Sequence, residues 1–188
     1  MTHLHCHLHC HLQYRPLDFT SLEDCRLLAR WENDPAIRRF TRPFQDEADF
    51  KQPADPDELL KKYAKTPRRE SVLADLMVLL DGEAVGSAGV EIDPPHQLSM
   101  KSGTAWYGIT LGEARARGRG LGVEVIRHLE DLSRSAGATQ AEVGVFEYNE
   151  ASIRLFEKLG YRRFGSVPEM TWWDGKLWTD LRYTKSLA

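Results

Sequence analysis

Residues 108–137 read GITLGEARARGRGLGVEVIRHLEDLSRSAG, and this stretch decides the fold class. A strand-like run at 107–111 is followed by a turn with three glycines, Gly118, Gly120 and Gly122, and then by an amphipathic helical pattern that ends at 137. Because glycine has no Cβ, successive backbone amides at the helix N-terminus can point at one anion, which the helix dipole also favours. The order of strand, glycine turn and helix therefore predicts a phosphate-binding turn.

The spacing of these glycines separates the turn from two familiar nucleotide motifs. Its pattern is GxGxG rather than the GxGxxG of dinucleotide-binding folds, and the GK(S/T) of a P-loop does not follow. Three arginines, Arg115, Arg117 and Arg119, add positive charge. The alternative interpretation is that the glycines only permit a tight reversal of the chain.

A second motif lies at 141–165, which read AEVGVFEYNEASIRLFEKLGYRRFG. A strand is predicted at 141–146, and Asn149 is placed to cap the helix that follows. Ile153, Phe156 and Leu159 form the inward face of this helix, and a glycine follows its last turn. The motif therefore predicts a second unit of strand and helix.

The remaining chain alternates strands and helices without a repeat or a second domain. Helices are predicted after Ser21 and around 58–65, and the acidic, proline-containing stretch 42–56 is expected to be partly irregular. The Asp81–Gly82 pair is a strong signal for a hairpin turn. Together these elements indicate one α/β domain with a mixed sheet. Strands are predicted at 12–18, 73–81, 84–92 and 104–112.

Taken together, the two motifs resemble the GNAT acetyltransferase family. The sequence RGRGLG at 117–122 fits the pyrophosphate loop of that family, (Q/R)xxGx(G/A), and NEASIRLFEKLGY at 149–161 fits its N…A…L(Y/F)EKxGF helix. The opening at 12–40 and the closing WWDGKLWTDLRYTKSL at 172–187 are similar to the ribosomal-protein and spermidine acetyltransferase branch. The resemblance covers about residues 12–187.

This resemblance implies a single-domain GNAT fold of the α/β class, formed by residues 12–188 and preceded by an extension at 1–11. The mixed, mostly antiparallel sheet would be flanked by helices and split into a V between 104–111 and 141–146, with acetyl-CoA as cosubstrate in the gap. A backbone N–H at Leu111 would stabilise the developing oxyanion. The implied cofactor-binding residues are Ile109 and Leu111 at the strand edge, Arg117, Gly118, Arg119, Gly120, Leu121, Gly122 and Val123 around the pyrophosphate, and Asn149 and Ser152 beside the cofactor arm.

Two catalytic positions of the family are changed in this chain. Phe156 stands where many members have the tyrosine that protonates the leaving thiolate, and Ala105 or Trp106 stands where a glutamate base is common. Glu91 at a strand end and Tyr148 beside the cleft are the remaining candidates for base and acid; the alternative for both is a surface or packing role. Weak acid–base equipment favours an acceptor of low pKa, because an α-amine with a pKa of about 7.7 to 8 is partly neutral at pH 7.

Two functions of different classes follow. The leading hypothesis is an acetyl-CoA-dependent N-acetyltransferase that modifies a primary amine of a small molecule or of a protein N-terminus. The alternative is a catalytically weak acyl-CoA-binding or sensor domain, which Phe156 and the missing strand glutamate motivate. The tryptophans Trp172, Trp173 and Trp178 are consistent with an acceptor pocket, a homodimer contact or core packing.

The composition limits the classes of partner and the cell compartment that we expect for this protein. The 188 residues include 25 Lys and Arg against 28 Asp and Glu, a net charge of −3, which argues against a nucleic-acid partner. The longest aliphatic run, 76–80, is far shorter than the roughly 20 residues that cross a bilayer, and no signal-peptide pattern opens the chain. We therefore expect no membrane partner, a cytoplasmic location and reduced thiols on the three cysteines.

The opening HLHCHLHCHL at 3–12 alternates histidine with leucine or cysteine. A period of two indicates a strand with five imidazoles on one face. A solvated edge strand or a simple extension is one interpretation, and metal binding is the other. Because the histidines and cysteines point to opposite faces, no metal ligand is assigned.

Overall fold

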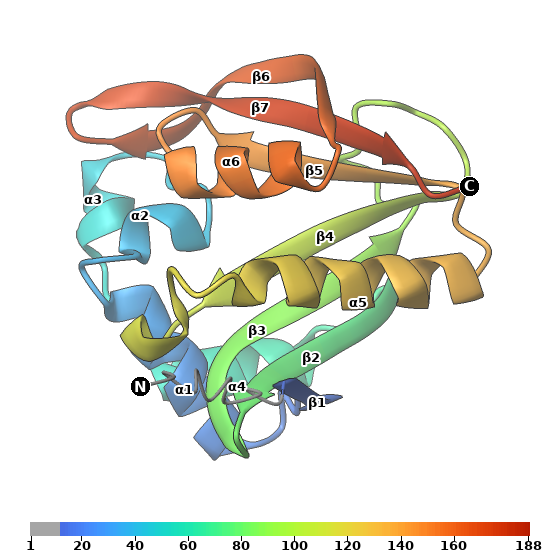
Figure 1. The fold of residues 1–188 in the computed structure, drawn as a ribbon. Coiled ribbons are helices and arrows are strands. Elements are labelled where there is room, and N and C mark those ends of the chain that lie inside the picture. The colour runs from blue at the N-terminus through green and yellow to red at the C-terminus, as the bar shows by residue number, and fades with distance from the viewer. Residues whose placement is uncertain (1–11) are drawn as a thin grey trace, which may run out of the picture.

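A seven-stranded sheet in the order β1-β2-β3-β4-β5-β7-β6 forms the centre of the computed structural model, which describes residues 12–188 (Figure 1). The predicted histidine strand and its metal hypothesis lie outside the described residues. Among the described strands, β4 and β5 form the one parallel pair, which confirms the mixed, mostly antiparallel fold class. The strands are β1 (Leu12–Pro16), β2 (Val72–Leu80), β3 (Glu83–Ile92), β4 (Thr104–Leu111), β5 (Gln140–Phe146), β6 (Arg162–Trp173) and β7 (Lys176–Ser186).

Helices cover both faces of this sheet. In Figure 1, α5 (Leu121–Ser135) and α6 (Glu150–Lys158) lie in front of the strands, and α4 (Pro56–Lys65) lies behind them. Within residues 12–188, no helix has the length and apolar character that a bilayer crossing requires. The other helices are α1 (Leu22–Asn33), α2 (Arg38–Thr41) and α3 (Glu47–Lys51), and a short 3-10 turn, η1 (Ala114–Ala116), follows β4.

Side-chain alternation along β2 explains how both faces are packed. Val78 is buried in the main core together with Ile126 of α5, whereas Met77 belongs to a second buried cluster with Trp31 of α1. Because neighbouring residues of a strand point to opposite faces, β2 contributes to both clusters. Its nearly continuous apolar sequence is typical of a strand that is buried on both sides.

The local signals in the sequence position the turns and helix ends as predicted. Asp81 and Gly82 have φ angles of 54° and 84°, as a two-residue turn between β2 and β3 requires. The side chain of Asn149 caps α6 by accepting the backbone N–H of Ser152 at 3.2 Å. Gly160, with a φ of 86°, follows the end of that helix.

The acidic stretch 42–56 is more regular than its prolines suggest. The side-chain oxygens of Asp46 and Asp55 cap α3 and α4. Arg38, which is buried, donates to the backbone carbonyls of Phe50, at 2.7 Å, and Gln52. Two aspartate caps and one buried arginine therefore order a segment that the sequence predicts to be partly irregular.

The sheet splits between its two central strands. Only three register pairs join β4 to β5, from Thr104–Gln140 to Trp106–Glu142. Beyond them β4 continues along β3 as far as Leu111, and β5 continues along β7 as far as Phe146. The two arms therefore diverge, and this is the V that the family resemblance implies.

Candidate active site

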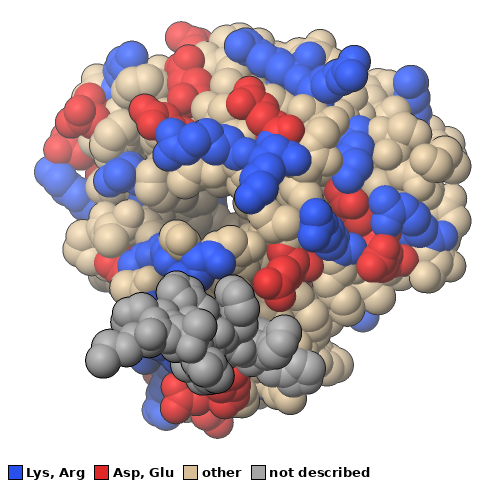
Figure 2. All heavy atoms as spheres, viewed as in Figure 1, with Lys and Arg blue, Asp and Glu red and all other residues tan. Residues whose placement is uncertain are grey.

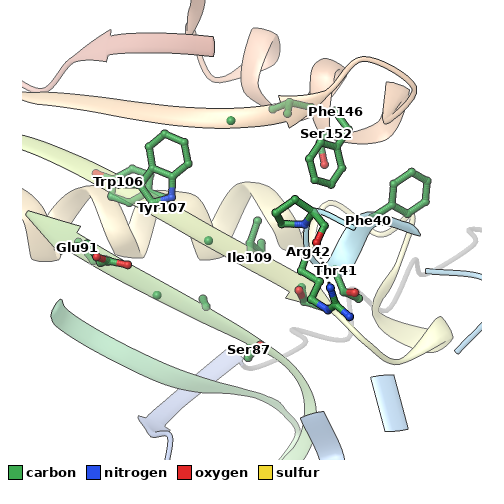
Figure 3. Close-up of a pocket in the computed structure, with 18 of the residues that line it drawn as sticks. Phe40, Thr41, Arg42, Ser87, Glu91, Trp106, Tyr107, Ile109, Phe146 and Ser152 are labelled. Atoms are coloured by element: carbon green, nitrogen blue, oxygen red, sulfur yellow. Dashed lines mark hydrogen bonds between the residues drawn. The ribbon is translucent and has the colours of Figure 1, made fainter. Parts of the chain in front are cut away.

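A cavity of about 680 Å³ fills the split between the arms, a size typical of a small-molecule site. In Figure 3, Trp106 and Ile109 come from β4, and Phe146 and Ser152 face them from β5 and α6. Glu91 lies at one end of the pocket, beside the paired part of the strands. Phe40, Thr41 and Arg42 lie at the other end (Figure 3).

The glycine turn lies at the N-terminus of α5, where two of its glycines need their conformational freedom. Gly118 and Gly120 have φ angles of 72° and 81°, and a Cβ at either position would meet no atom within 4 Å. The loop surface is thus open to close approach by a ligand. The first amides of α5, those of Leu121 and Gly122, have no helical carbonyl before them and can bond to an anion there.

The third glycine of the motif has a different task. A Cβ on Gly122 would lie 3.2 Å from Cδ2 of Leu155, so its small size lets α5 pack closely against α6. The backbone N–H groups of two other predicted contacts, Arg117 and Val123, donate to the carbonyls of Ala114 and Gly120 within the turn. Their main-chain donors therefore shape the loop.

Two of the arginines around the turn form ion pairs. The guanidinium of Arg115 lies 2.7 Å from Glu83, and that of Arg117 lies 3.7 Å from Asp34. Arg119 donates to the carbonyl of Arg115 at 3.3 Å. Figure 2 shows that the face carrying α5 and α6 is hollowed, with Lys and Arg side chains on both sides of the hollow. This surface suits a polyanionic ligand arm.

The remaining predicted cofactor contacts lie on both arms. Ile109, Asn149 and Ser152 line the cavity. Leu111 is not among its lining residues, and it pairs with Gly86 at the end of β4. Because the side-chain oxygen of Asn149 already caps α6, this residue fixes the position of the helix at the cavity.

The carboxylate of Glu91 lines the cavity but is engaged by neighbouring groups. One oxygen accepts a hydrogen bond from Arg69 at 2.9 Å, and the other accepts one from the hydroxyl of Ser71 at 3.1 Å. The side chain is 17% exposed. Both oxygens of Glu91 are therefore already bonded to donors of the protein.

Tyr148 is not among the residues that line the cavity. It donates to the backbone carbonyl of Arg39 at 2.6 Å, and its ring packs against Trp173 with centroids 4.7 Å apart. Burial raises the pKa of Tyr148 to about 12, so its proton is held more tightly than that of a free phenol. In this conformation the hydroxyl is hydrogen-bonded to the backbone of α2.

Phe156 does line the cavity, so the change from tyrosine falls at the site itself. The ring is buried and packs edge-on against Tyr161, with centroids 5.2 Å apart. The hydroxyl of Tyr161 does not compensate, because it donates to the buried Glu130 at 3.0 Å. No phenolic proton from these two residues faces the cavity.

A polar cluster on β5 and β7, which begins at the last β4–β5 register pair and follows the diverging arm, was not predicted from the sequence. Asp180 and Arg182 of β7 line the cavity, while Leu181 and Tyr183 between and beyond them belong to the core. This alternation was visible in the sequence TDLRY as the signal of a strand with one polar face. Glu142 of β5 completes the cluster, 3.4 Å from Arg182. Among residues 12–188, no group of three metal-ligating side chains is present.

Comparison with known proteins places this geometry in a family. The model of the acetyltransferase (GNAT) family matches residues 23–161. The uncharacterized N-acetyltransferase YdgE of Bacillus subtilis is 32% identical over 80 residues, which is 43% of this chain and 48% of the relative. The spermine/spermidine N(1)-acetyltransferase of the same organism is 26% identical over 88 residues, 46% of this chain and 58% of the relative. The alignments thus span about half the length of these curated relatives.

Solved structures agree on the fold along nearly the whole chain. Spermidine N-acetyltransferase from Vibrio cholerae, solved in complex with CoA and spermine, superposes with a TM-score of 0.72 at 19% identity. The superposition covers 94% of this chain and 95% of the other. The matched sequence model includes both the glycine turn and the α6 motif that border the split. The chain belongs to the acetyltransferase (GNAT) family.

Proposed function

We propose that this protein is an acetyl-CoA-dependent N-acetyltransferase that modifies a primary amine of a small molecule or of a protein N-terminus. The observation that carries the proposal is the split between β4 and β5, which holds a cavity of about 680 Å³, together with the glycine turn at the N-terminus of α5, where Gly122 packs against Leu155 of α6. Acetyl-CoA, when bound, supplies an acetyl thioester that an amine can attack. Family membership supports the same cosubstrate.

In this proposal the two arms divide the binding of acetyl-CoA. The amides of Gly118 to Gly122 and the dipole of α5 hold the pyrophosphate, because a helix N-terminus carries unpaired donors and partial positive charge. The free edge of β4 near Ile109 and Leu111 bonds to the pantetheine arm as an added strand would. A backbone N–H at Leu111 donates to the acetyl oxygen as negative charge develops there. Asn149 and Ser152 border the arm from α6.

The cavity lining carries three carboxylates and two guanidinium groups, those of Arg42 and Arg182. The carboxylates are those of Asp75, Glu91 and Asp180. Burial raises the pKa of Asp75, whose nearest cation is Arg68 at 3.8 Å. An ammonium group complements carboxylates of this kind, so we propose a cationic alkylamine as the acceptor. The relative named for spermine and spermidine supports testing polyamines first.

Glu91 and Tyr148 remain proposals for base and acid. Glu91 is bonded to Arg69, and Tyr148 is bonded to the carbonyl of Arg39. Each of these hydrogen bonds must break before the side chain can exchange a proton with substrate. Positioning of the amine against the thioester is therefore expected to supply much of the rate enhancement.

The second candidate function, an acyl-CoA-binding sensor with weak turnover, is favoured by one observation. Phe156 lines the cavity, and its side chain has no proton to donate to the leaving thiolate. A sensor would bind acetyl-CoA and release no thiol, whatever amine is added.

The proposal extends to location and assembly. We propose that the protein acts in the cytoplasm, where the free thiol of the buried Cys25 would stay reduced. A homodimer is proposed through the β6–β7 hairpin, which exposes the apolar side chains of Phe164 and Leu177. Size-exclusion chromatography with light scattering tests the assembly, and a monomer at micromolar concentration would contradict it. Residues 1–11 are proposed as an extension to the catalytic domain at 12–188.

A thiol-release assay tests the central activity. Acetyl-CoA is incubated with polyamines, amino acids, aminoglycosides and short peptides with free N-termini, and free coenzyme A is measured. We expect release with at least one amine and formation of the acetylated amine by mass spectrometry. Binding of acetyl-CoA without turnover of any acceptor would favour the sensor.

A further inference from the structure

Asp180 lies on β7 beside the part of β5 that has diverged from β4, and it lines the cavity. Its register partner on β5 is Phe146, another lining residue, so the two side chains share one face. The residue is only 4% exposed. Asp180 is thus a buried carboxylate at the edge of a cavity large enough for a substrate. Burial of an ionised carboxylate costs free energy unless the charge is paired.

The carboxylate of Asp180 is only partly satisfied. Its Oδ2 lies 3.1 Å from Nε of Arg182, whereas its Oδ1 has no hydrogen-bond partner among the described residues. Arg182 is shared with a second carboxylate, because its Nη1 lies 3.4 Å from Glu142. Glu142 also receives the backbone N–H groups of Leu98 and Ser99 at 2.7 and 2.9 Å. One cation thus serves two acids, and Glu142 holds the better set of donors.

The opposite strand leaves space for this carboxylate. A Cβ on Gly144 of β5, which also lines the cavity, would lie 2.5 Å from Oδ2 of Asp180. No real side chain fits at that distance, so the glycine is required if the carboxylate is to lie flat against β5. The Asp180 carboxylate therefore occupies a place prepared by its neighbour.

The charged and titratable groups around Asp180 act in opposite directions. Burial raises the pKa of Asp180 to about 6; Arg182 lowers it, Glu142 raises it, and the backbone N–H of Val145 lowers it. Tyr148, the other ionisable group influenced by Asp180, is neutral because burial raises its own pKa to about 12. Asp180 is consequently ionised at pH 7 but takes up a proton more readily than an exposed aspartate.

We propose that Asp180 is the catalytic residue that accepts the proton an acceptor ammonium must lose before attack. This inference rests on the proposed acetyl transfer. Glu91, another acid of the cavity lining, accepts hydrogen bonds on both oxygens, whereas Oδ1 of Asp180 lacks a hydrogen-bond partner among residues 12–188.

Acetyl transfer through Asp180 moves two protons from the ammonium group. One ammonium proton moves to the Asp180 carboxylate, and the neutral nitrogen forms a C–N bond to the acetyl carbonyl carbon. As the C–S bond breaks, the sulfur keeps its electron pair and receives a second proton from the nitrogen. Asp180 returns its proton to solvent, and the products are the amide and coenzyme A as a free thiol.

The pH dependence of kcat/KM tests this role. The probe is the alkylamine that wild type acetylates fastest in the thiol-release panel. If Asp180 deprotonates a bound ammonium, kcat/KM rises to about pH 6 and then stays level up to the pKa of the amine. In Asp180→Asn only amine that is already neutral reacts, so kcat/KM falls on the order of 10²- to 10³-fold at pH 7 and rises tenfold per pH unit up to the pKa of the amine.

Controls separate this role from a structural one. Asp180→Asn should keep the thermal shift produced by acetyl-CoA, and the exposed Asp131→Asn on α5 should keep the wild-type profile. Gly144→Ala displaces the Asp180 carboxylate without removing it. Its kcat/KM should also rise with pH up to the pKa of the amine, as in Asp180→Asn. This variant tests the role of Asp180 if Asp180→Asn does not fold.

Three results would overturn the inference. A loss of kcat/KM by the same factor at every pH in Asp180→Asn would assign the carboxylate to structure. An unchanged profile in Gly144→Ala would do the same. Conversion of the profile by Glu91→Gln but not by Asp180→Asn would identify Glu91 as the base. Failure of wild type to acetylate any amine would contradict the proposed function itself. The wild-type assay is therefore done before any variant is tested.

Discussion

At the scale of single residues, Phe156 stands where the family resemblance implies a tyrosine that protonates the leaving thiolate. Phe156 is buried, lines the cavity and cannot donate a proton to sulfur. Coenzyme A is a fair leaving group, because its thiol has a pKa near that of cysteine, about 8.5. The missing hydroxyl should therefore lower the rate less than the roughly 10²- to 10⁴-fold that general acid catalysis usually contributes.

We predict that Phe156→Tyr raises kcat by less than about tenfold, because the added hydroxyl can protonate a thiolate that already leaves readily. Steady-state thiol release with saturating acetyl-CoA measures the change, and the thermal midpoint reports whether the variant is folded. An unchanged or lower kcat with an unchanged midpoint would contradict the prediction and mean that a hydroxyl at this position does not protonate the sulfur.

At the scale of elements, α1 is tied to the end of β4 by an unusually close contact. A Cβ on Gly112 would lie 2.2 Å from the ring of Trp31, and Nε1 of that tryptophan donates to Glu113 at 2.8 Å. The loop that contains the glycine turn begins directly after these residues. The packing of α1 therefore helps to hold the proposed pyrophosphate loop in place.

We predict that Gly112→Ala destabilises the protein by about 1–3 kcal/mol and weakens acetyl-CoA binding, because the methyl group must push the tryptophan and the loop apart. Urea unfolding and a titration with acetyl-CoA measure the two effects. Gly108→Ala on the same strand is the stability control, since its Cβ would meet nothing within 4 Å. Equal stability of both variants would contradict the packing argument.

A second element-scale contact makes stability depend on pH. The buried Asp24 of α1 accepts hydrogen bonds from two guanidinium nitrogens of Arg15, at 2.5 and 2.7 Å, and from the backbone N–H of Asp18 at 2.9 Å. The hydrogen bond from Arg15 lowers the pKa of Asp24 below its usual value. A carboxyl group of this kind stabilises the fold at pH values above its unfolded pKa, about 3.9, and loses that contribution as the pH falls through the folded value.

We predict that Asp24→Asn lowers the free energy of unfolding by about 1.5–3 kcal/mol at pH 7, the range for hydrogen bonds to charged groups. The difference from wild type should shrink as the pH falls below about 4, because the Asp24 carboxyl of the unfolded chain then begins to bind a proton, and it should be lost as the pH falls through the lower folded pKa. Urea unfolding at a series of pH values between about 7 and 3 gives both quantities. A difference that is the same at every pH would exclude the charge as its origin.

At the scale of the whole molecule, the sequence predicts the fold further than it predicts the chemistry. The turn at Asp81 and Gly82, the cap at Asn149 and the glycine turn before α5 are local signals, and each is found where its spacing places it. The split follows from the family motifs, and the register of β4 and β5 confirms it.

The polar end of the cavity depends on contacts between distant segments, which single-sequence patterns do not record. Asp180 and Glu142 are 38 residues apart in the sequence and share Arg182 only because β5 and β7 pair. Likewise, no local pattern reveals that the hydroxyl of Tyr148 is held by α2. Site chemistry therefore required the folded arrangement.

Acetyl-CoA binding in the split is the central claim, and thermal unfolding with and without acetyl-CoA tests it most directly. At a hundredfold excess over Kd the ligand should stabilise wild type by about 2.7 kcal/mol and raise its midpoint. Gly120→Val should lose this shift, whereas Gly175→Val, with nearly the same φ (82° against 81°) in the distant β6–β7 turn, should keep it. An unchanged wild-type midpoint at millimolar acetyl-CoA, or an equal shift in Gly120→Val, would contradict the account.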